Sequence, residues 1–325
     1  MLKKSIFVIV IIQTCLFSTF SMNSQEAVKT AVASFELQIP LNAVAGVGNI
    51  VLEDKNIGSS FSAYIQEAIA NELKQSSKFE FSDRRQLDLI MNEIKLGLTG
   101  VTDESTSVEP GLLRGLEYIV SGTYFVGEGS ISLFLKLIEI ESGLVVGDSR
   151  LDIEKNSIPR GISLFPPNYD DALYIIEELS DISGSGEGLD IRVWNTRGEG
   201  GTYRDGENLQ VNFYSSTDCY IKLYHIDVNN KLSLIFPNQY YSDNFIKAGK
   251  IYRIPDSRYP FSFTLGSPYG IEFIKIAAST LQFDDIEEAF SELGTASSAL
   301  LSRGLSVQKK EKQSAEEIFS YTILE

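Results

Sequence analysis

The chain has 325 residues, of which 43% are hydrophobic and 22% are charged, which is typical of a globular protein with room for two domains. A disordered or fibrous chain is therefore excluded. The formal net charge is −16, and residues 22–187 carry most of it, with 12 Lys and Arg against 26 Asp and Glu. Because this acidic surface repels phosphate backbones and anionic lipids, we expect no nucleic-acid partner.

The first residues have the layout of a secretory signal peptide. Lys3 and Lys4 precede an apolar run at positions 6–12, and the small residues Thr19 and Ser21 follow. We therefore predict a signal peptide over residues 1–21, an exported protein, and no transmembrane span in the mature chain. Cys15 as a lipidated first residue, as in lipoproteins, is an alternative, although its neighbours suit that role poorly. An uncleaved anchor is a further, less favoured alternative.

Residues 22–182 alternate between strand and helix patterns. The segment "TAVASFELQIP" at 30–40 alternates and ends in proline, which predicts a first strand. Residues 59–77 then place Phe61, Ile65, Ala68, Ile69 and Leu73 at helical spacing. A short strand is expected at 78–83. A second helix is expected at 83–100, where Asp83 and Gln86 form a near capping box. Its predicted core face consists of Leu87, Ile90, Met91, Ile94 and Leu98.

The same half continues with a strand at 116–125 and a hairpin at 130–153 that turns at Ser142-Gly143. A helix at 170–182 ends it, and "SGSGEG" at 183–188 is the best linker candidate. The predicted fold of this half is an α+β module with helices packed on a mixed sheet.

Residues 189–325 contain many short strand patterns separated by Gly, Asn, Asp and Pro, which predicts a mainly-β, sandwich-like domain or a partial barrel. Asn229-Asn230 indicates a tight hairpin, because asparagine tolerates left-handed backbone conformations. A helix is expected near 284–301 and a strand at 317–324. The other predicted strands are residues 189–195, 208–215, 219–228, 231–237, 250–255 and 271–279.

The residue types that carry most enzyme chemistry are scarce. Outside the predicted signal, the chain has one histidine, His225, and one cysteine, Cys219, so we expect no metal site, no cofactor and no disulfide within the chain. We interpret His225 as a strand histidine with its hydrogen bonds satisfied, and Cys219 as a small buried apolar residue. The glycine runs at 127–130 and 198–207 indicate turns. Paired carboxylates on helical segments indicate solvated faces, and a carboxylate-dependent hydrolase stays a remote alternative.

Aromatic residues in loop-like segments are the main positive signal. Such rings bind peptides or glycans, since a flat ring offers a large contact area at low entropic cost. The alternative is that these rings only cap the core of the sandwich. The candidate ligand-binding residues are Tyr240, Tyr241, Phe245, Tyr259 and Phe261.

Arg84 and Arg85 form a second candidate site. Both fall in the first turn of the helix predicted at 83–100, where the helix dipole disfavours cations. We therefore predict that at least one of them pairs with carboxylates of the acidic module or of a neighbouring subunit.

The run "VASFEL", "YIQEAIANELKQSSKF", "DRRQLDLIMNEIKLGLTG", "GLEYIVSGTYF" and "ISLFLKLIEIESGLVVGDS" resembles the CsgG-like family over about residues 30–155. This family includes the curli secretion channel, flagellar outer-membrane proteins of the FlgO type and lipoprotein activators of peptidoglycan synthases. The resemblance implies a periplasmic, non-enzymatic module for assembly or docking, which forms rings in the curli channel. Residues 98–115 are short and polar where that channel has membrane-inserted segments, so the resemblance does not extend to a pore.

Residues 188–325 resemble a bacterial domain of unknown function that follows other exported modules. "GTYRDGENLQVNF", "LIFPN" and "AGKIYRIP" carry the resemblance, which implies no catalytic residues. We therefore expect an exported assembly, docking or scaffold protein in the periplasm or at the outer membrane, with an envelope partner or self-association. A glycan- or peptide-binding module is the alternative. The residues where the family pattern is strongest are Tyr203, Gly206, Tyr220, Phe236, Pro237, Asn238, Gly249, Pro255 and Gly270.

Overall fold

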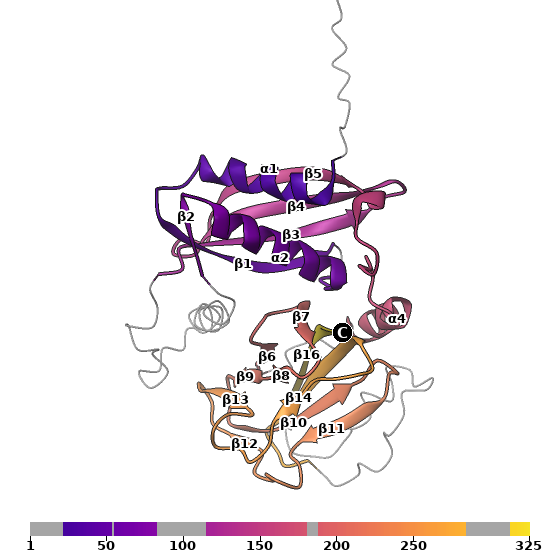
Figure 1. Ribbon diagram of the computed structural model, residues 1–325. Coiled ribbons are helices and arrows are strands. Elements are labelled where there is room, and N and C mark those ends of the chain that lie inside the picture. The colour runs from indigo at the N-terminus through magenta and orange to yellow at the C-terminus, as the bar shows by residue number, and fades with distance from the viewer. Residues whose placement is uncertain (1–21, 54, 83–114, 181–187, 284–312) are drawn as a thin grey trace, which may run out of the picture.

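The computed structural model describes residues 22–53, 55–82, 115–180, 188–283 and 313–325. The first half is a five-stranded sheet with helices α1 and α2. Figure 1 shows these helices on one face of the sheet, and a second body made almost entirely of strands below it. The predicted combination of an α+β module and a mainly-β, sandwich-like domain is confirmed. The predicted signal peptide, most of the predicted linker, and the helices expected at 83–100 and 284–301 lie outside the described residues.

The first element is a helix, α1 (Ser24–Glu36), so the strand predicted at 30–40 is wrong. The Asn23 side chain caps this helix by accepting a hydrogen bond of 2.9 Å from the Glu26 N–H. The short alternation seen at 30–40 belongs to a longer pattern with three- and four-residue spacing, which is the helical period. The apolar residues that this pattern buries are Ala27, Val28, Ala31, Val32 and Phe35.

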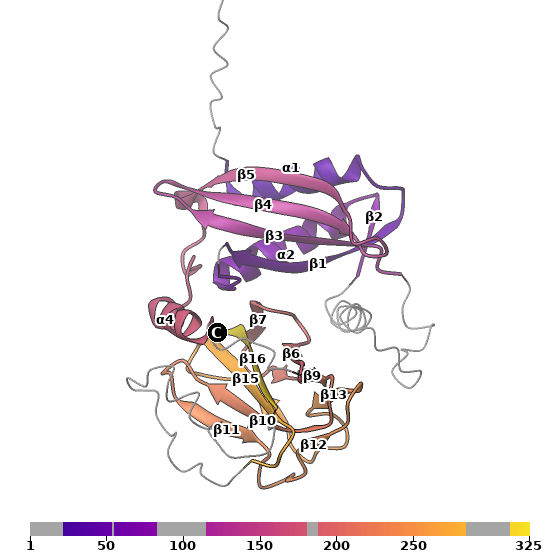
Figure 2. The same cartoon turned by 180° about the vertical axis from the view of Figure 1, so that it is seen from behind.

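The five-stranded sheet has the order β2-β1-β3-β4-β5. Strand β1 runs parallel to both of its neighbours, and the remaining pairs are antiparallel. The hairpin turn at Ser142-Gly143 is confirmed, and Gly143 has a φ of 69°. Figure 2 shows the sheet from its other face, with β5 as the outermost strand. The strands are β1 (Ala43–Leu52), β2 (Phe79–Phe81), β3 (Tyr118–Val126), β4 (Ser130–Glu139) and β5 (Val145–Glu154).

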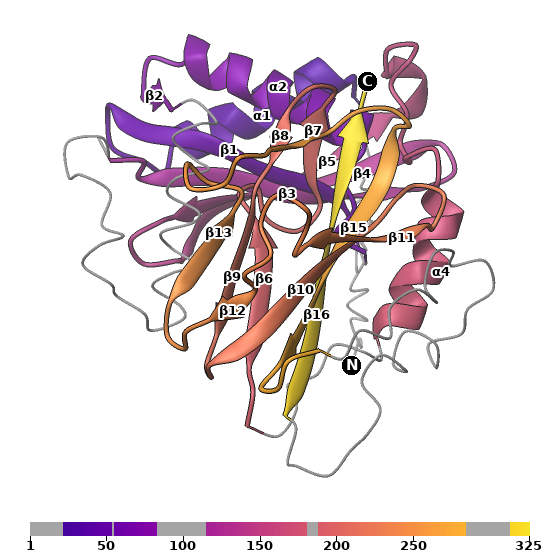
Figure 3. The same cartoon turned by 90° about the horizontal axis from the view of Figure 1, so that it is seen from below.

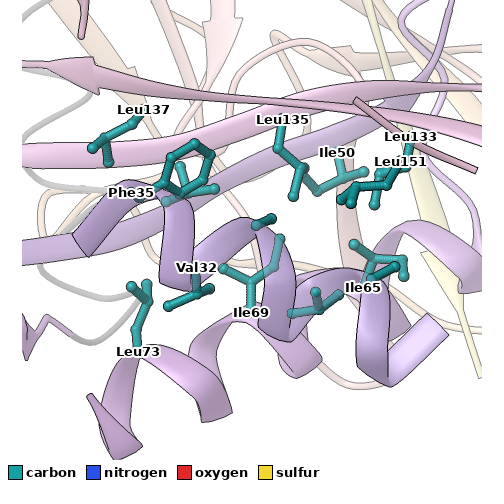
Figure 4. Packing of buried hydrophobic residues seen from close by; sticks show 14 of the residues in the cluster. Val32, Phe35, Ile50, Ile65, Ile69, Leu73, Leu133, Leu135, Leu137 and Leu151 are labelled. Carbon is teal, nitrogen blue, oxygen red and sulfur yellow. The ribbon is translucent and has the colours of Figure 1, made fainter. Parts of the chain in front are cut away.

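Helix α2 (Ser60–Gln75) confirms the helix predicted at 59–77. Ser59 caps it in a capping box with Ser62, which satisfies two backbone donors that would otherwise lack partners. Figure 4 shows the side chains of both helices packed against the sheet. Burying one such side chain completely contributes about 1.5–3 kcal/mol, so this layer supplies the main stability of the module. The fully buried residues of α2 are Phe61, Ile65, Ile69 and Leu73.

Helix α4 (Tyr169–Ser180) confirms the helix predicted at 170–182, but its apolar side packs on the C-terminal strands. Ala172 and Ile175 are buried in a cluster with Ile226, Ile271 and Phe273. Figure 1 shows α4 beside the lower, β-rich body. This helix therefore ties the connecting segment to the C-terminal half.

The C-terminal half contains a sheet of order β11-β10-β15-β16-β7, with β12 paired to β10. A three-stranded sheet, β13-β9-β6, and the pair β14-β8 complete it, and Figure 3 shows these strands from below. Asn230 has a φ of 62° in the β10–β11 turn, as predicted for Asn229-Asn230. In the glycine run 198–207, which was predicted to form turns, residues 201–204 form strand β7 instead. The strands are β6 (Ile191–Asn195), β7 (Gly201–Arg204), β8 (Asn208–Leu209), β9 (Val211–Ser215), β10 (Cys219–Ile226), β11 (Leu232–Phe236), β12 (Phe245–Ile246), β13 (Ile251–Ile254), β14 (Phe263–Thr264), β15 (Gly270–Ser279) and β16 (Ser314–Leu324).

Candidate functional site

The two halves of the molecule meet at a junction made of hydrogen bonds between residues far apart in the sequence. The side-chain amide of Asn49, a residue of β1, donates hydrogen bonds to the carbonyl oxygens of Arg197 and Glu199, at 2.6 and 3.2 Å. The Thr322 hydroxyl of β16 donates to the Gly58 carbonyl at 3.0 Å. On the α4 side, the Asn168 side chain exchanges hydrogen bonds with the backbone of Ile271. The junction is therefore anchored at several separate points.

Two glycines let the backbones approach closely at this junction. A Cβ atom on Gly200 would lie 1.9 Å from the Asn56 carbonyl oxygen, and Gly200 also has a φ of 68°. A Cβ atom on Gly58 would lie 2.5 Å from the Gly200 carbonyl oxygen. Distances this short exclude any side chain without movement of the backbone. The sequence "GEGG" thus serves the contact between the halves as well as a turn.

Arg197 lies at the junction, where its backbone carbonyl accepts from Asn49, while its side chain is held by the C-terminal half. It forms a bidentate ion pair with Glu207, with N–O distances of 2.7 and 2.8 Å, and donates to the Thr202 carbonyl at 2.5 Å. Its guanidinium group also lies 4.2 Å from the centre of the Tyr203 ring. The Arg197 side chain is 13% exposed and the Glu207 side chain is 37% exposed, so solvent reaches this pair from the Glu207 side. Our sequence reasoning missed this residue.

A cavity of about 270 Å³ lies beside Arg197, between α2 and β7. Its wall carries charges of both signs, from Lys74 and Glu67 on α2 and from Arg204 and Glu207 on the C-terminal side. Both carboxylate oxygens of Glu207 accept hydrogen bonds. The two terminal guanidinium nitrogens of Arg197 donate one to each oxygen, and the Arg204 backbone N–H also donates to Oε2. Glu207 is therefore held as a structural carboxylate. Residues of both halves therefore line this cavity.

Residues suited to nucleophilic or metal chemistry are not gathered in the described part of the chain. No group of three or more His, Cys, Asp or Glu side chains there has the spacing of a metal site. His225 bonds to Glu272 at 2.8 Å, and Tyr321 donates to the same carboxylate oxygen at 2.8 Å, which satisfies the histidine within the sheet. Cys219 is buried, and burial raises the pKa of its thiol. His225 thus lies in a strand with a hydrogen-bond partner, and Cys219 is a buried residue, as predicted.

The structure brings together four of the five aromatic residues predicted as a ligand site. Tyr241 and Tyr259 have ring centroids 4.8 Å apart, Tyr259 and Phe261 5.5 Å, and Tyr240 and Phe261 6.3 Å. Phe245 lies outside this group, because it packs on Tyr220 with Lys247 over its ring. We call the group of Tyr240, Tyr241, Tyr259 and Phe261 the aromatic cluster.

The aromatic cluster has a buried base and an exposed top. Phe236 lies beneath it, and Tyr241, Tyr259 and Phe261 pack partly against the core of the sandwich. Burial raises the pKa of Tyr259 to about 12, so its hydroxyl stays protonated at any physiological pH. Tyr240 is 61% exposed and presents its ring to solvent. Core capping and an exposed contact ring therefore coexist in one cluster.

Arg84 and Arg85, the predicted pairing residues, lie outside the described residues, so their role stays a prediction. Within the part of the chain that the structure describes, no helix has the length and apolar character needed to cross a bilayer.

Comparisons with known proteins divide the chain in the same way as the fold. Residues 19–127 match the family described as "Curli production assembly/transport component CsgG", and residues 202–282 match a domain of unknown function, DUF4384. The expected order of a CsgG-like module followed by a domain of unknown function is thus confirmed. No curated protein gives a significant match to the chain.

Three similar solved structures are forms of LpoB. The C-terminal domain of LpoB from Salmonella enterica is 14% identical, and the match covers 41% of this chain and 98% of that one with a TM-score of 0.31. The same domain from Escherichia coli is 16% identical, with coverage of 41% and 96% and a TM-score of 0.28. The solution structure of E. coli LpoB is 16% identical, with coverage of 47% and 80% and a TM-score of 0.29.

Proposed function

We propose that this protein is a non-enzymatic, exported component of the cell envelope that docks onto an assembly through its α+β module. The observation that carries the proposal is the match of residues 19–127 to a family described as a curli production assembly/transport component. The arrangement of side chains agrees with it. Among the described residues, Glu207 at the cavity is ion-paired with Arg197, and His225 is hydrogen-bonded to Glu272.

The junction gives the proposal a mechanism. Because Asn49, Gly58 and Gly200 join the two halves through short backbone contacts, the module and the sandwich act as one body in an assembly. Binding energy at the module therefore fixes the orientation of the C-terminal loops without a further entropic cost for ordering a loose domain.

The test of this proposal is chemical cross-linking of the native envelope followed by mass spectrometry of peptides linked to the chain. We expect reproducible cross-links from the acidic module to one envelope protein or to a second copy. Cross-links scattered over abundant envelope proteins, at the frequency seen for an unrelated exported protein of similar charge, would contradict it.

A second function is favoured by a separate observation, the 61% exposure of Tyr240 at the top of the aromatic cluster. Such a ring, packed on Phe261, is suited to stack on a sugar or on an apolar peptide side chain. We propose that the cluster contributes to retention of a glycan or peptide ligand. Tyr240→Ala should reduce retention on immobilised cell-wall glycan or on a peptide array, whereas Phe245→Ala, 38% exposed and outside the cluster, should not. Equal retention by both variants and the parent protein would reject this role.

A further inference from the structure

Strand β5 forms an edge of the five-stranded sheet, and part of that edge is open. Its inner side pairs with β4 continuously from Gly147 to Glu154, and a bulge interrupts the register at Val146. On its outer side, Met22 donates to the Asp152 carbonyl and accepts from the Glu154 N–H, both at 3.0 Å. Among the described residues, no other segment forms a backbone hydrogen bond with the outer side between Val145 and Leu151. A stretch of strand is therefore free to accept a further strand.

The Met22 contacts identify which backbone groups point outward. Asp152 and Glu154 both use outward groups, and in an antiparallel sheet the N–H and C=O of one residue point to the same side. Alternate residues of the regular ladder share this direction, so the open outward groups belong to Asp148 and Arg150. The side chains of Asp148 and Arg150 are exposed, whereas Gly147 and Leu151 between and beside them are buried toward the helices.

We infer that this edge pairs with the same edge of a second copy, in an antiparallel two-fold arrangement centred on Ser149. With the axis at Ser149, Asp148 of each copy lies opposite Arg150 of the other, and each such pair exchanges its backbone hydrogen bonds. Both charge pairs are then attractive. The inference rests on the proposed function as an assembly module and names a second copy as the partner.

Charge complementarity selects this register over its neighbours. If the axis moved to Asp148 or to Arg150, like charges would lie directly opposite each other, which destabilises a strand pair. Met22 already occupies the edge at Asp152–Glu154, so pairing stops there and cannot slide further. The edge thus carries its own register signal, and the two-fold contact closes on itself as a dimer instead of continuing as a filament or a ring.

Apolar groups flank the open edge at one end. Leu144 is 63% exposed and Val145 is 52% exposed, next to the start of β5. The C-terminal end of α1 lies over the same part of the strand, because a Cβ on Gly147 would contact Phe35 and Gln38 at 3.1 Å. Just beyond that end, Leu37 is 84% exposed. A second copy that extends the sheet would reduce the exposure of such groups, which adds a favourable term to the strand pairing.

Charge reversal provides a test that separates this arrangement from other modes of association. The full chain, purified as the cell exports it, is examined by sedimentation equilibrium at several concentrations. We expect a monomer–dimer equilibrium for the parent chain. Asp148→Arg alone and Arg150→Asp alone each place like charges opposite each other, so each should weaken dimerisation by at least about tenfold. The two single variants mixed together should restore it, because every opposed pair in the mixed dimer is again attractive.

Matched controls are Glu128→Arg and Arg160→Asp, which make the same charge changes at exposed positions away from β5 and should leave dimerisation unchanged. Thermal melts of each variant check that the exposed substitutions leave the fold intact. A parent chain that stays monomeric, or a dimer insensitive to both reversals, would overturn the inference. A monomeric chain that still gives specific cross-links to an envelope protein would overturn this inference alone and leave the proposed function standing.

Discussion

The contact between the two halves leads to a sharp prediction at Gly200, which combines a close backbone approach with a left-handed conformation. Gly200→Ala places a Cβ 1.9 Å from the Asn56 carbonyl oxygen, at a residue with a φ of 68°. The left-handed conformation costs an alanine about 1–2 kcal/mol, and forced overpacking costs a further ~1–3 kcal/mol. We therefore expect Gly200→Ala to lower the free energy of unfolding by about 2–5 kcal/mol in total.

Two other glycines separate these contributions. Gly206 has a φ of 80° with open space around it, so Gly206→Ala should show the conformational cost alone, about 1–2 kcal/mol. Gly58 lacks a left-handed φ, but its Cβ would lie 2.5 Å from the Gly200 carbonyl oxygen, so Gly58→Ala should show the steric cost alone, about 1–3 kcal/mol. The three variants together measure what the close approach contributes.

The assay is urea unfolding followed by two signals. Trp194, the single tryptophan, lies buried in β6 and reports on the C-terminal half, while far-UV circular dichroism also reports on the helices of the module. In the parent chain the docked halves should unfold close together, whereas in Gly200→Ala the two transitions should separate. If Gly200→Ala cost no more than Gly206→Ala and the transitions stayed together, the reasoning about the junction would be refuted.

Three further variants test other parts of the structure. Burial raises the pKa of Glu317 to about 7 from its ordinary 4.5, so the stability present below pH 4.5 should be lost as the pH rises through 7. Glu317→Gln should remove about 3 kcal/mol of that pH dependence, measured by unfolding from pH 4 to 8. Arg197→Lys keeps the charge but loses the bidentate pair with Glu207, so it should cost about 1–2 kcal/mol in urea unfolding; a neutral result would show that charge alone suffices. Tyr124→Phe removes the hydroxyl between Ser59 and the Leu164 carbonyl, and should cost about 1–2 kcal/mol by thermal unfolding, against no change for Tyr174→Phe on an exposed face.

The sequence was sufficient for elements whose periodicity is long and regular. Helix α2, the β4–β5 hairpin and most C-terminal strands follow from apolar spacing and from turn residues such as Gly143 and Asn230. The first helix was misread as a strand because a few residues near Phe35 alternate, whereas the helical period becomes clear only from Ala27 onward.

Strand β1 was not predicted because it contains two glycines, which weaken any strand pattern. At Gly48 the reason is packing, since a Cβ there would lie 2.9 Å from the Ile119 side chain of β3. Only the position of a neighbouring strand explains that glycine, and no local pattern contains this information.

The candidate site also divides into residues that a local sequence pattern predicts and residues that depend on contacts elsewhere in the fold. Loop-like context was enough to find Tyr240, Tyr241, Tyr259 and Phe261, but it also included Phe245, which packs elsewhere on Tyr220. Arg197 was missed because the nearby partners of its side chain, Thr202, Tyr203 and Glu207, form no recognisable sequence motif with it. The Asn49 side chain, which bonds to the Arg197 carbonyl, comes from the other half of the molecule, and such pairings have no signature in a single sequence.

The position of β16 has a consequence for how the protein is made. This strand lies between β15 and β7 within its sheet, and its Thr322 also contacts Gly58 in the module. During synthesis β16 emerges long after the strands that it joins, so neither the sheet nor the junction can close on a partly translated chain. The C-terminal half would therefore remain open until translation has delivered this strand. A ribosome that stalls before β16 would release a product with an exposed sheet, which proteases would cleave more readily than the folded protein.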